Sequence, residues 1–109
     1  MKLFVYGTLA PGKPNEHILA PLGGRWTEAS VKGELKQQGW GADLGFPGIV
    51  LNPNGNTVQG MLLEAPALEQ HWHSLDAFEG NAYQRVETEV QLTNGEVTVA
   101  YIYALNGEV

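Results

Sequence analysis

The sequence contains no cysteine. This absence excludes disulfide bonds, thiolate catalysis and cysteine metal sites, and it fits a reducing compartment. Basic residues are also scarce, because six lysines and arginines stand against twelve acidic residues and leave a formal net charge of −6. Nucleic-acid binding depends largely on cations that neutralise phosphates. Without a basic run, the chain is not expected to bind nucleic acid.

Long hydrophobic runs are missing as well. No segment approaches the ~20 apolar residues that a membrane-spanning helix needs. The apolar part of the opening segment, Met1 to Gly7, is too short for a secretion signal. We therefore expect a cytoplasmic protein with no membrane partner.

Glycine and proline, in contrast, are frequent, with fourteen and six among 109 residues. They divide the sequence into short pieces, which favours strands and tight turns over long helices. The length suits a single domain over residues 1–109. Strands are predicted at residues 2–6, 25–37 with a break at Gly33, 48–51, 57–64, 85–92 and 96–105. Between the second and third of these, a glycine-rich loop carrying Trp40 and Phe46 is expected to be mobile.

One helix is predicted between Pro66 and Gly80. Leu68, Trp72 and Leu75 recur at helical spacing, proline suits the first turn of a helix, and glycine is a natural stop. The strand after it alternates apolar and polar residues, and Asn94-Gly95 then predicts a two-residue hairpin turn. The return strand is apolar on both faces, which predicts that it is covered on both sides and lies centrally in a sheet or barrel.

The segment Leu3-Phe4-Val5-Tyr6-Gly7-Thr8-Leu9 is an apolar strand that runs directly into a loop. Gly7 permits backbone conformations that a Cβ would obstruct, so the following N–H groups could form a concavity that binds a carboxylate. The alternative interpretation is an ordinary exit from a strand with Tyr6 packed in the core.

Glu79 is the second candidate, because it lies at the C-terminal end of the predicted helix. The helix dipole there opposes a negative charge, and Phe78 and Tyr83 could partly desolvate the carboxylate, so its pKa should be raised. Such a group suits proton transfer. A plain surface glutamate is the alternative, and Asp76 is interpreted as a cap or surface residue.

Other residue patterns are weaker. His71 and His73 are two positions apart on the predicted helix and point in different directions, so no metal site is expected. His17 fits a solvated helical residue better than a catalytic base. Trp40 is interpreted as a loop anchor or core residue, with substrate contact as the alternative.

Two motifs together resemble one family. The chain is similar to the gamma-glutamylcyclotransferase-like proteins, most closely to the gamma-glutamylamine cyclotransferase branch, in the segments Phe4 to Leu9 with Gly12 to Asn15, Leu75 to Gly80, and Tyr83 to Val86. The resemblance implies a small α+β fold, a mixed β-barrel or sheet with one main helix and short helical turns. It also implies that the first loop and Glu79 face one cavity.

Active members of that family cyclise a γ-glutamyl group, and the resemblance implies the same acyl transfer here. The substrate's α-amino nitrogen attacks its own γ-carbonyl carbon, which releases 5-oxoproline and a free amine or amino acid without a cofactor. Glu79 is the implied general acid and base, and the implied substrate-binding residues are Tyr6, Gly7, Thr8, Leu9 and Tyr83. Arg85 could pair with a substrate carboxylate or form a structural ion pair. The identity of the leaving amine stays open, and the competing hypothesis is a non-enzymatic module that binds a small carboxylate in the same cavity.

Overall fold

A computed structural model describes residues 1–38, 40, 45 and 47–105. Its elements are β1 (Lys2–Val5), η1 (Glu16–Ile18), η2 (Ala20–Leu22), β2 (Arg25–Lys36), β3 (Gly48–Leu51), β4 (Asn56–Glu64), η4 (Pro66–Gln70), α1 (Trp72–Glu79), β5 (Tyr83–Leu92) and β6 (Val97–Leu105). The predicted mobility of the loop around Trp40 and Phe46 concerns mostly residues outside the described set. Within that set, no helix is long and apolar enough to cross a membrane.

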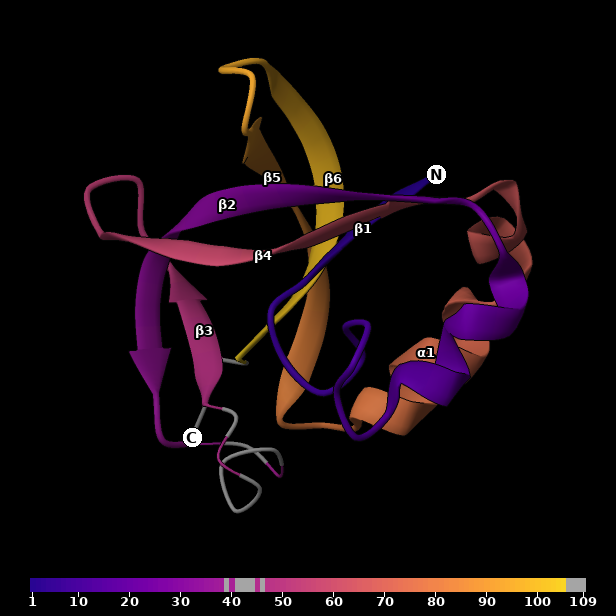
Figure 1. Ribbon diagram of the computed structural model, residues 1–109. Coiled ribbons are helices and arrows are strands. Elements are labelled where there is room, and N and C mark those ends of the chain that lie inside the picture. Colours follow the sequence, from indigo (N-terminus) through magenta and orange to yellow (C-terminus); the bar gives the residue numbers. More distant parts are fainter. Residues whose placement is uncertain (39, 41–44, 46, 106–109) are drawn as a thin grey trace.

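The strands form a closed barrel with one strand attached to it (Figure 1). Hydrogen-bonded neighbours follow the order β3-β2-β4-β1-β6-β5, and an additional pairing of β2 with β5 closes the ring. All pairings are antiparallel except that of β1 with β6, which is parallel. The closing contact is short, with Ala29 opposite Leu92 and Ser30 opposite Gln91. The mixed β-barrel expected from the resemblance is therefore present.

Gly33 is the point at which β2 changes partner. Up to this residue β2 pairs with β4, and from this residue on it pairs with β3. A Cβ on Gly33 would lie 2.6 Å from the carbonyl oxygen of Val50, so only glycine lets the two backbones approach this closely. The predicted break is thus a bend within one continuous strand, visible in Figure 1 where β2 turns to run beside β3.

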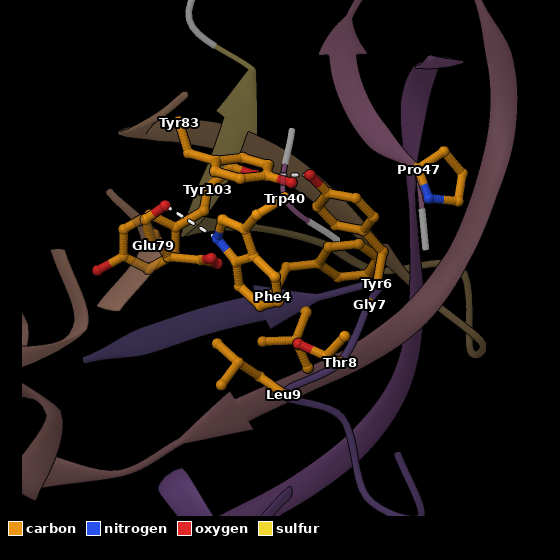
Figure 2. A pocket seen from close by; sticks show the side chains of 11 residues that line it. Phe4, Tyr6, Gly7, Thr8, Leu9, Trp40, Pro47, Glu79, Tyr83 and Tyr103 are labelled. Carbon is orange, nitrogen blue, oxygen red and sulfur yellow. Dashed lines mark hydrogen bonds between the residues drawn. The ribbon is translucent and has the colours of Figure 1, made fainter. Parts of the chain in front are cut away.

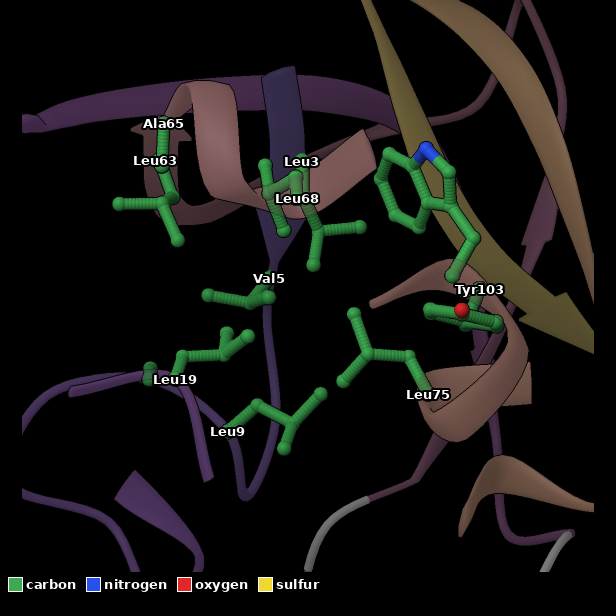
Figure 3. Packing of buried hydrophobic residues seen from close by; sticks show 11 residues of the cluster. Leu3, Val5, Leu9, Leu19, Leu63, Ala65, Leu68, Leu75 and Tyr103 are labelled. Atoms are coloured by element: carbon green, nitrogen blue, oxygen red, sulfur yellow. The ribbon is translucent and has the colours of Figure 1, made fainter. Parts of the chain in front are cut away.

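The hydrophobic core has two parts, one on each face of the barrel wall. Inside the barrel, Phe4 packs with a cluster from all strands: Ala29, Val31, Ile49, Val58, Leu62, Val90, Ala100, Ile102 and Ala104. Outside it, Leu3 and Val5 face the helical segments and pack with Leu9, Leu19, Leu63, Ala65, Leu68, Trp72, Leu75 and Tyr103 (Figure 3). The alternation along β1 therefore places one residue in the barrel between two that hold the helical layer.

The predicted helix is divided. Residues 66–70 form the 3₁₀-helix η4, the chain turns at His71, and the α-helix covers only Trp72–Glu79. The residues at the junction are Gln70, His71, Trp72 and His73, most of which are only moderate helix formers, so packing rather than propensity decides the local geometry. The predicted stop at Gly80 is confirmed, because this residue follows α1 with a φ of 78°.

The last hairpin differs from its prediction at two points. Its loop is not the predicted two-residue turn, because the strands end at Leu92 and resume at Val97, with Gly95 at a positive φ of 90°. The predicted burial of both faces holds for the second half of β6 only. Val97 and Val99 are 59% and 53% exposed, because this end of the hairpin extends beyond the barrel (Figure 1).

Candidate functional site

A pocket opens where β1 ends, between its exit loop and the end of α1 (Figure 2). It is lined by Phe4, Val5, Tyr6, Gly7, Thr8, Leu9, Trp40, Pro47, Glu79, Tyr83 and Tyr103. The cavity volume is about 40 Å³, well below the ~300–1,000 Å³ of sites that enclose whole drug-sized ligands. A space of this size suits the reacting part of a small ligand, such as a carboxylate, an amine or an amide.

Glu79 is the acidic group of the pocket. It is the last residue of α1 and lies partly buried among aromatic side chains. Burial raises the pKa of its carboxyl to about 7, because an apolar environment disfavours the charged form. The expected rise in pKa is confirmed, with burial as its cause. At neutral pH the group can therefore both accept and donate a proton.

Trp40 closes one side of this environment. Its indole Nε1–H donates to the backbone carbonyl oxygen of Glu79 at 3.0 Å, which satisfies one of the carbonyls left free at the end of α1. Its ring meets those of Phe78 and Tyr83 edge-on, with centroid separations of 5.3 and 6.4 Å. Trp40 thus both anchors its loop and lines the pocket.

Tyr6 is held by its hydroxyl. The hydroxyl donates to the carbonyl oxygen of Tyr103 at 2.7 Å and accepts from the backbone N–H of Ile49 at 3.0 Å. Burial raises the pKa of Tyr6 above its usual range, and burial followed by the hydrogen bond to Asp76 does the same for the pKa of Tyr103. Both phenols stay neutral at physiological pH, so neither competes with Glu79 as the base.

The carbonyl groups of the exit loop from β1 are hydrogen-bonded within the loop itself. The carbonyl oxygen of Gly7 accepts from the N–H of Ala10 at 3.2 Å, and that of Thr8 accepts from the N–H of Asn15 at 2.8 Å. Within the described part of the chain, the N–H groups of Gly7, Thr8 and Leu9 have no hydrogen-bond partner. Thr8 and Leu9 are nevertheless only 7% and 4% exposed.

Buried N–H groups without a partner are rare in folded proteins, because each one loses its hydrogen bonds to water. Here three unpartnered N–H groups follow one another in residues that line the pocket, of which Thr8 and Leu9 are buried and Gly7 is half-buried. Such a succession of donors suits an anion or a developing oxyanion. The loop does not owe this to a special backbone conformation at Gly7. The described residues with positive φ are Gly12, Gly23, Gly24, Gly45, Gly80 and Gly95, and Gly7 is not among them.

Comparison with known protein families identifies the family of this chain. The model of the family described as "Gamma-glutamyl cyclotransferase, AIG2-like" matches residues 3–109. The chain belongs to this family. No significant match to a curated protein was found.

Several solved structures are similar to this AIG2-like chain. A crystal structure of an AIG2-like protein from Mus musculus has a TM-score of 0.79 at 26% identity, over 99% of this chain and 78% of that one. YkqA from Bacillus subtilis has a TM-score of 0.73 at 32% identity. The match covers 96% of this chain but only 35% of the YkqA chain. A yeast γ-glutamyl cyclotransferase specific to glutathione shares the fold, with a TM-score of 0.58 at 15% identity over 100% and 73% of the two chains.

The AIG2-like chain brings all of its predicted site residues to one pocket. Tyr6, Gly7, Thr8 and Leu9 come from the first motif, and Glu79 and Tyr83 come from the second. His17 is exposed on η1 and does not line the pocket, and His71 and His73 are exposed as well. Among the described residues, no three His, Asp or Glu side chains are grouped as metal ligands.

Two features of the site were not predicted. Tyr103 lines the pocket, whereas the sequence predicted only that its strand is covered on both faces. Asp76 is a surface residue, as one of its two interpretations had it, but Arg85 also forms an ion pair with it at 3.0 Å, which the sequence did not predict. Of the two roles left open for Arg85, the structure shows the structural ion pair. Spacing along the chain could not reveal the contacts of Asp76 with Tyr103 and Arg85, because both contacts join α1 to strands that follow it.

Proposed function

We propose that the protein is a γ-glutamyl cyclotransferase with Glu79 as its general acid and base, formed by one domain over residues 1–109. The observation that carries the proposal is the pairing, in one pocket, of a carboxyl with a pKa of about 7 and three N–H donors without partners. Family membership supports the same reaction class.

The reaction needs little from the protein beyond the Glu79 carboxyl and the three N–H donors. The substrate's α-ammonium loses a proton to the Glu79 carboxylate, and the freed amine attacks the γ-carbonyl carbon to close a five-membered ring. The C–N bond to the leaving amine then breaks as Glu79 returns the proton to that nitrogen. The ring nitrogen gives its second proton to the Glu79 carboxylate or to water, and the departing amine takes up one proton in turn to leave as an ammonium ion. The products are 5-oxoproline and a free amine, with no water consumed. Holding the substrate folded supplies much of the acceleration, since intramolecular attack avoids the entropic cost of bringing two reactants together.

The loop at Gly7, Thr8 and Leu9 is the proposed cradle for the substrate's negative charge. Lysine, arginine and histidine are all absent from the residues that line the described pocket. The substrate carboxylate, or the oxygen that becomes negative during attack, therefore depends on the backbone N–H groups. Tyr6 shapes the wall, and Tyr83 contacts the substrate or orients Glu79.

The same lack of cations favours γ-glutamyl amines over γ-glutamyl amino acids. An amino-acid leaving group carries a carboxylate next to the scissile bond, and this charge would face aromatic rings and Glu79 without a basic partner. Residues 39, 41–44, 46 and 106–109 add no basic residue, because their sequence is Gly, Gly-Ala-Asp-Leu, Phe and Asn-Gly-Glu-Val. An amine leaving group avoids this cost.

A panel of γ-glutamyl amines, γ-glutamyl amino acids and glutathione tests both levels of the proposal. We expect 5-oxoproline by mass spectrometry, with the highest kcat/KM for an amine. Glu79→Gln should reduce kcat by about 10² or more, the usual loss when an acid–base group is removed. Glu87→Gln, an exposed carboxylate on β5, is the matched control and should retain activity.

The outcomes separate the alternatives. Saturable binding of these compounds without 5-oxoproline would support a binding module and refute the enzyme. Undiminished turnover by Glu79→Gln would refute the role of this residue. A preference for amino acids or glutathione would leave the reaction in place and refute the choice of leaving group.

A further inference from the structure

Asp76 is the centre of a polar cluster behind the pocket, on the side of α1 that faces β5 and β6. Its Oδ1 accepts from the Tyr103 hydroxyl at 2.6 Å and from Arg85 Nε at 3.0 Å, and its Oδ2 accepts from Arg85 Nη2 at 3.3 Å. The Arg85 hydrogen bonds, more than any other contact, lower the pKa of Asp76, so the carboxylate stays ionised at neutral pH. Three elements therefore meet at one charged group.

Arg85 is itself held by two rings. Its guanidinium lies 4.5 Å from the centroid of Trp72 and 5.0 Å from that of Tyr101. Trp72 and Asp76 are four residues apart on α1, so Arg85 contacts two successive turns of the same helix face. The guanidinium thus joins the helix to β5 and β6 at two points.

The position of Asp76 makes this cluster relevant to Glu79. The backbone carbonyl of Asp76 accepts from the N–H of Gly80 at 3.0 Å, so the turn that contains Glu79 begins at the residue that the cluster holds. α1 has only eight residues and no side-chain N-cap, and a helix this short is marginal without packing. Its orientation therefore depends on its tertiary contacts.

The cluster also reaches the opposite wall of the pocket. Tyr103 lines the pocket, its hydroxyl donates to Asp76, and its carbonyl accepts from the Tyr6 hydroxyl. Two hydrogen bonds, joined through the covalent frame of Tyr103, thus connect Tyr6, the residue after β1, to Asp76 in α1. The stability that the ion pair adds is small, because its side chains are 24% and 45% exposed. The main consequence of the ion pair is for the position of the last turn of α1.

We propose that Asp76 is a positioning residue, which through Arg85 and Tyr103 holds the last turn of α1 so that Glu79 faces the loop from Tyr6 to Leu9. The effect on turnover rests on the proposed function, whereas the effect on the environment of Glu79 does not. Displacement of a catalytic group by about 1 Å can cost on the order of 10²-fold in rate.

The test compares Asp76→Asn, Tyr103→Phe and their double variant with the wild type, with Glu87→Gln as the control. We expect Asp76→Asn to lower kcat by about tenfold or more while KM changes by less than about threefold. Tyr103→Phe should act in the same direction. The double variant should be no worse than the more impaired single variant, because both substitutions break the same connection.

Several results would overturn the proposal. They are a kcat for Asp76→Asn within about twofold of the wild type, losses that multiply in the double variant, or an equal loss in Glu87→Gln. Melting temperatures measured in parallel identify a loss that comes from unfolding. If Asp76→Asn does not fold, Tyr103→Phe decides alone, because it keeps the ring and removes one hydrogen bond.

A second readout separates this proposal from the proposed function. If the wild type forms no 5-oxoproline, the titration of the Glu79 carboxyl by NMR still reports its surroundings. In Asp76→Asn and Tyr103→Phe the midpoint should fall by about half a pH unit or more, since a released Glu79 regains contact with water. An unchanged midpoint would refute the positioning role whatever the activity.

Discussion

Glu79→Gln should make the folded protein more stable while it removes the acid–base group. Burial raises the pKa of Glu79 from its ordinary value of 4.5 to about 7. At ~1.4 kcal/mol per pH unit, this corresponds to a cost of about 3 kcal/mol for keeping the ionised group in the folded protein. Glutamine is neutral and nearly the same size, so it avoids that cost.

The sign of the pH dependence follows from the direction of the shift. Below pH 4.5 Glu79 is protonated in both the folded and the unfolded protein, so no cost arises. Between pH 4.5 and about 7 the unfolded chain loses the proton first, and the stability of the wild type falls as the pH rises. The stability advantage of Glu79→Gln should therefore widen by about 2 kcal/mol from pH 5.5 to pH 8. Asp76, whose pKa is lowered, makes the folded protein more stable as the pH rises. Its contribution cancels from the difference between wild type and Glu79→Gln, because both proteins contain Asp76.

Urea unfolding of the two proteins at several pH values, followed by circular dichroism and tryptophan fluorescence, measures this difference. The exposed Glu87→Gln provides the baseline and should show a difference from the wild type that is nearly independent of pH. A gap for Glu79→Gln that stays constant or narrows towards pH 8 would show that Glu79 is not a buried, proton-retaining carboxyl. The assignment of Glu79 as the acid and base would then lose its physical basis.

Two further substitutions test the packing in and behind the wall of the pocket. Tyr6→Phe removes the hydroxyl that joins the N–H of Ile49 to the carbonyl of Tyr103, and should lower the free energy of unfolding by about 1–3 kcal/mol because both groups lose a buried partner. An unfolding curve like that of the wild type would contradict the proposed link. Gly60→Ala should cost about 1–3 kcal/mol, since its Cβ would lie 2.4 Å from the carbonyl oxygen of Val5 and 2.5 Å from the ring of Phe4. Gly80→Ala serves as the comparison in the same urea assay, because an added Cβ at Gly80 would have no atom within 4 Å. Its loss of stability should come only from the strain of a positive φ.

Local sequence patterns predicted the helices and strands better than they predicted which elements pack against one another. The alternation around Val90, the stop at Gly80 and the apolar strand before Tyr6 all depend on short-range rules, and the structure agrees with them. The bend at Gly33 and the division of the helix at His71 depend on which strand or core residue lies opposite. Such contacts are set by the register of distant segments, which spacing along one chain does not encode.

The candidate site shows the same division. Glu79 and the loop after β1 were found because each belongs to a short motif. Tyr103 and the pairing of Asp76 with Arg85 were missed, because their place follows from the barrel that brings β6 beside β1. The motifs thus pointed to the candidate residues, and the residues that surround and support them became visible only in three dimensions.

The parallel pairing of β1 with β6 has a consequence for how the pocket forms. Leu3 lies beside Tyr101, and the hydroxyl of Tyr6 bonds to Tyr103, a residue 97 positions away. Contacts this distant in sequence close large loops and tend to form late, which makes folding slow. Until β6 docks, the loop that follows β1 has no opposite wall. The ability to bind a ligand should therefore appear at the end of folding, together with the final cooperative step, so recovery of ligand binding should lag behind recovery of secondary structure during refolding.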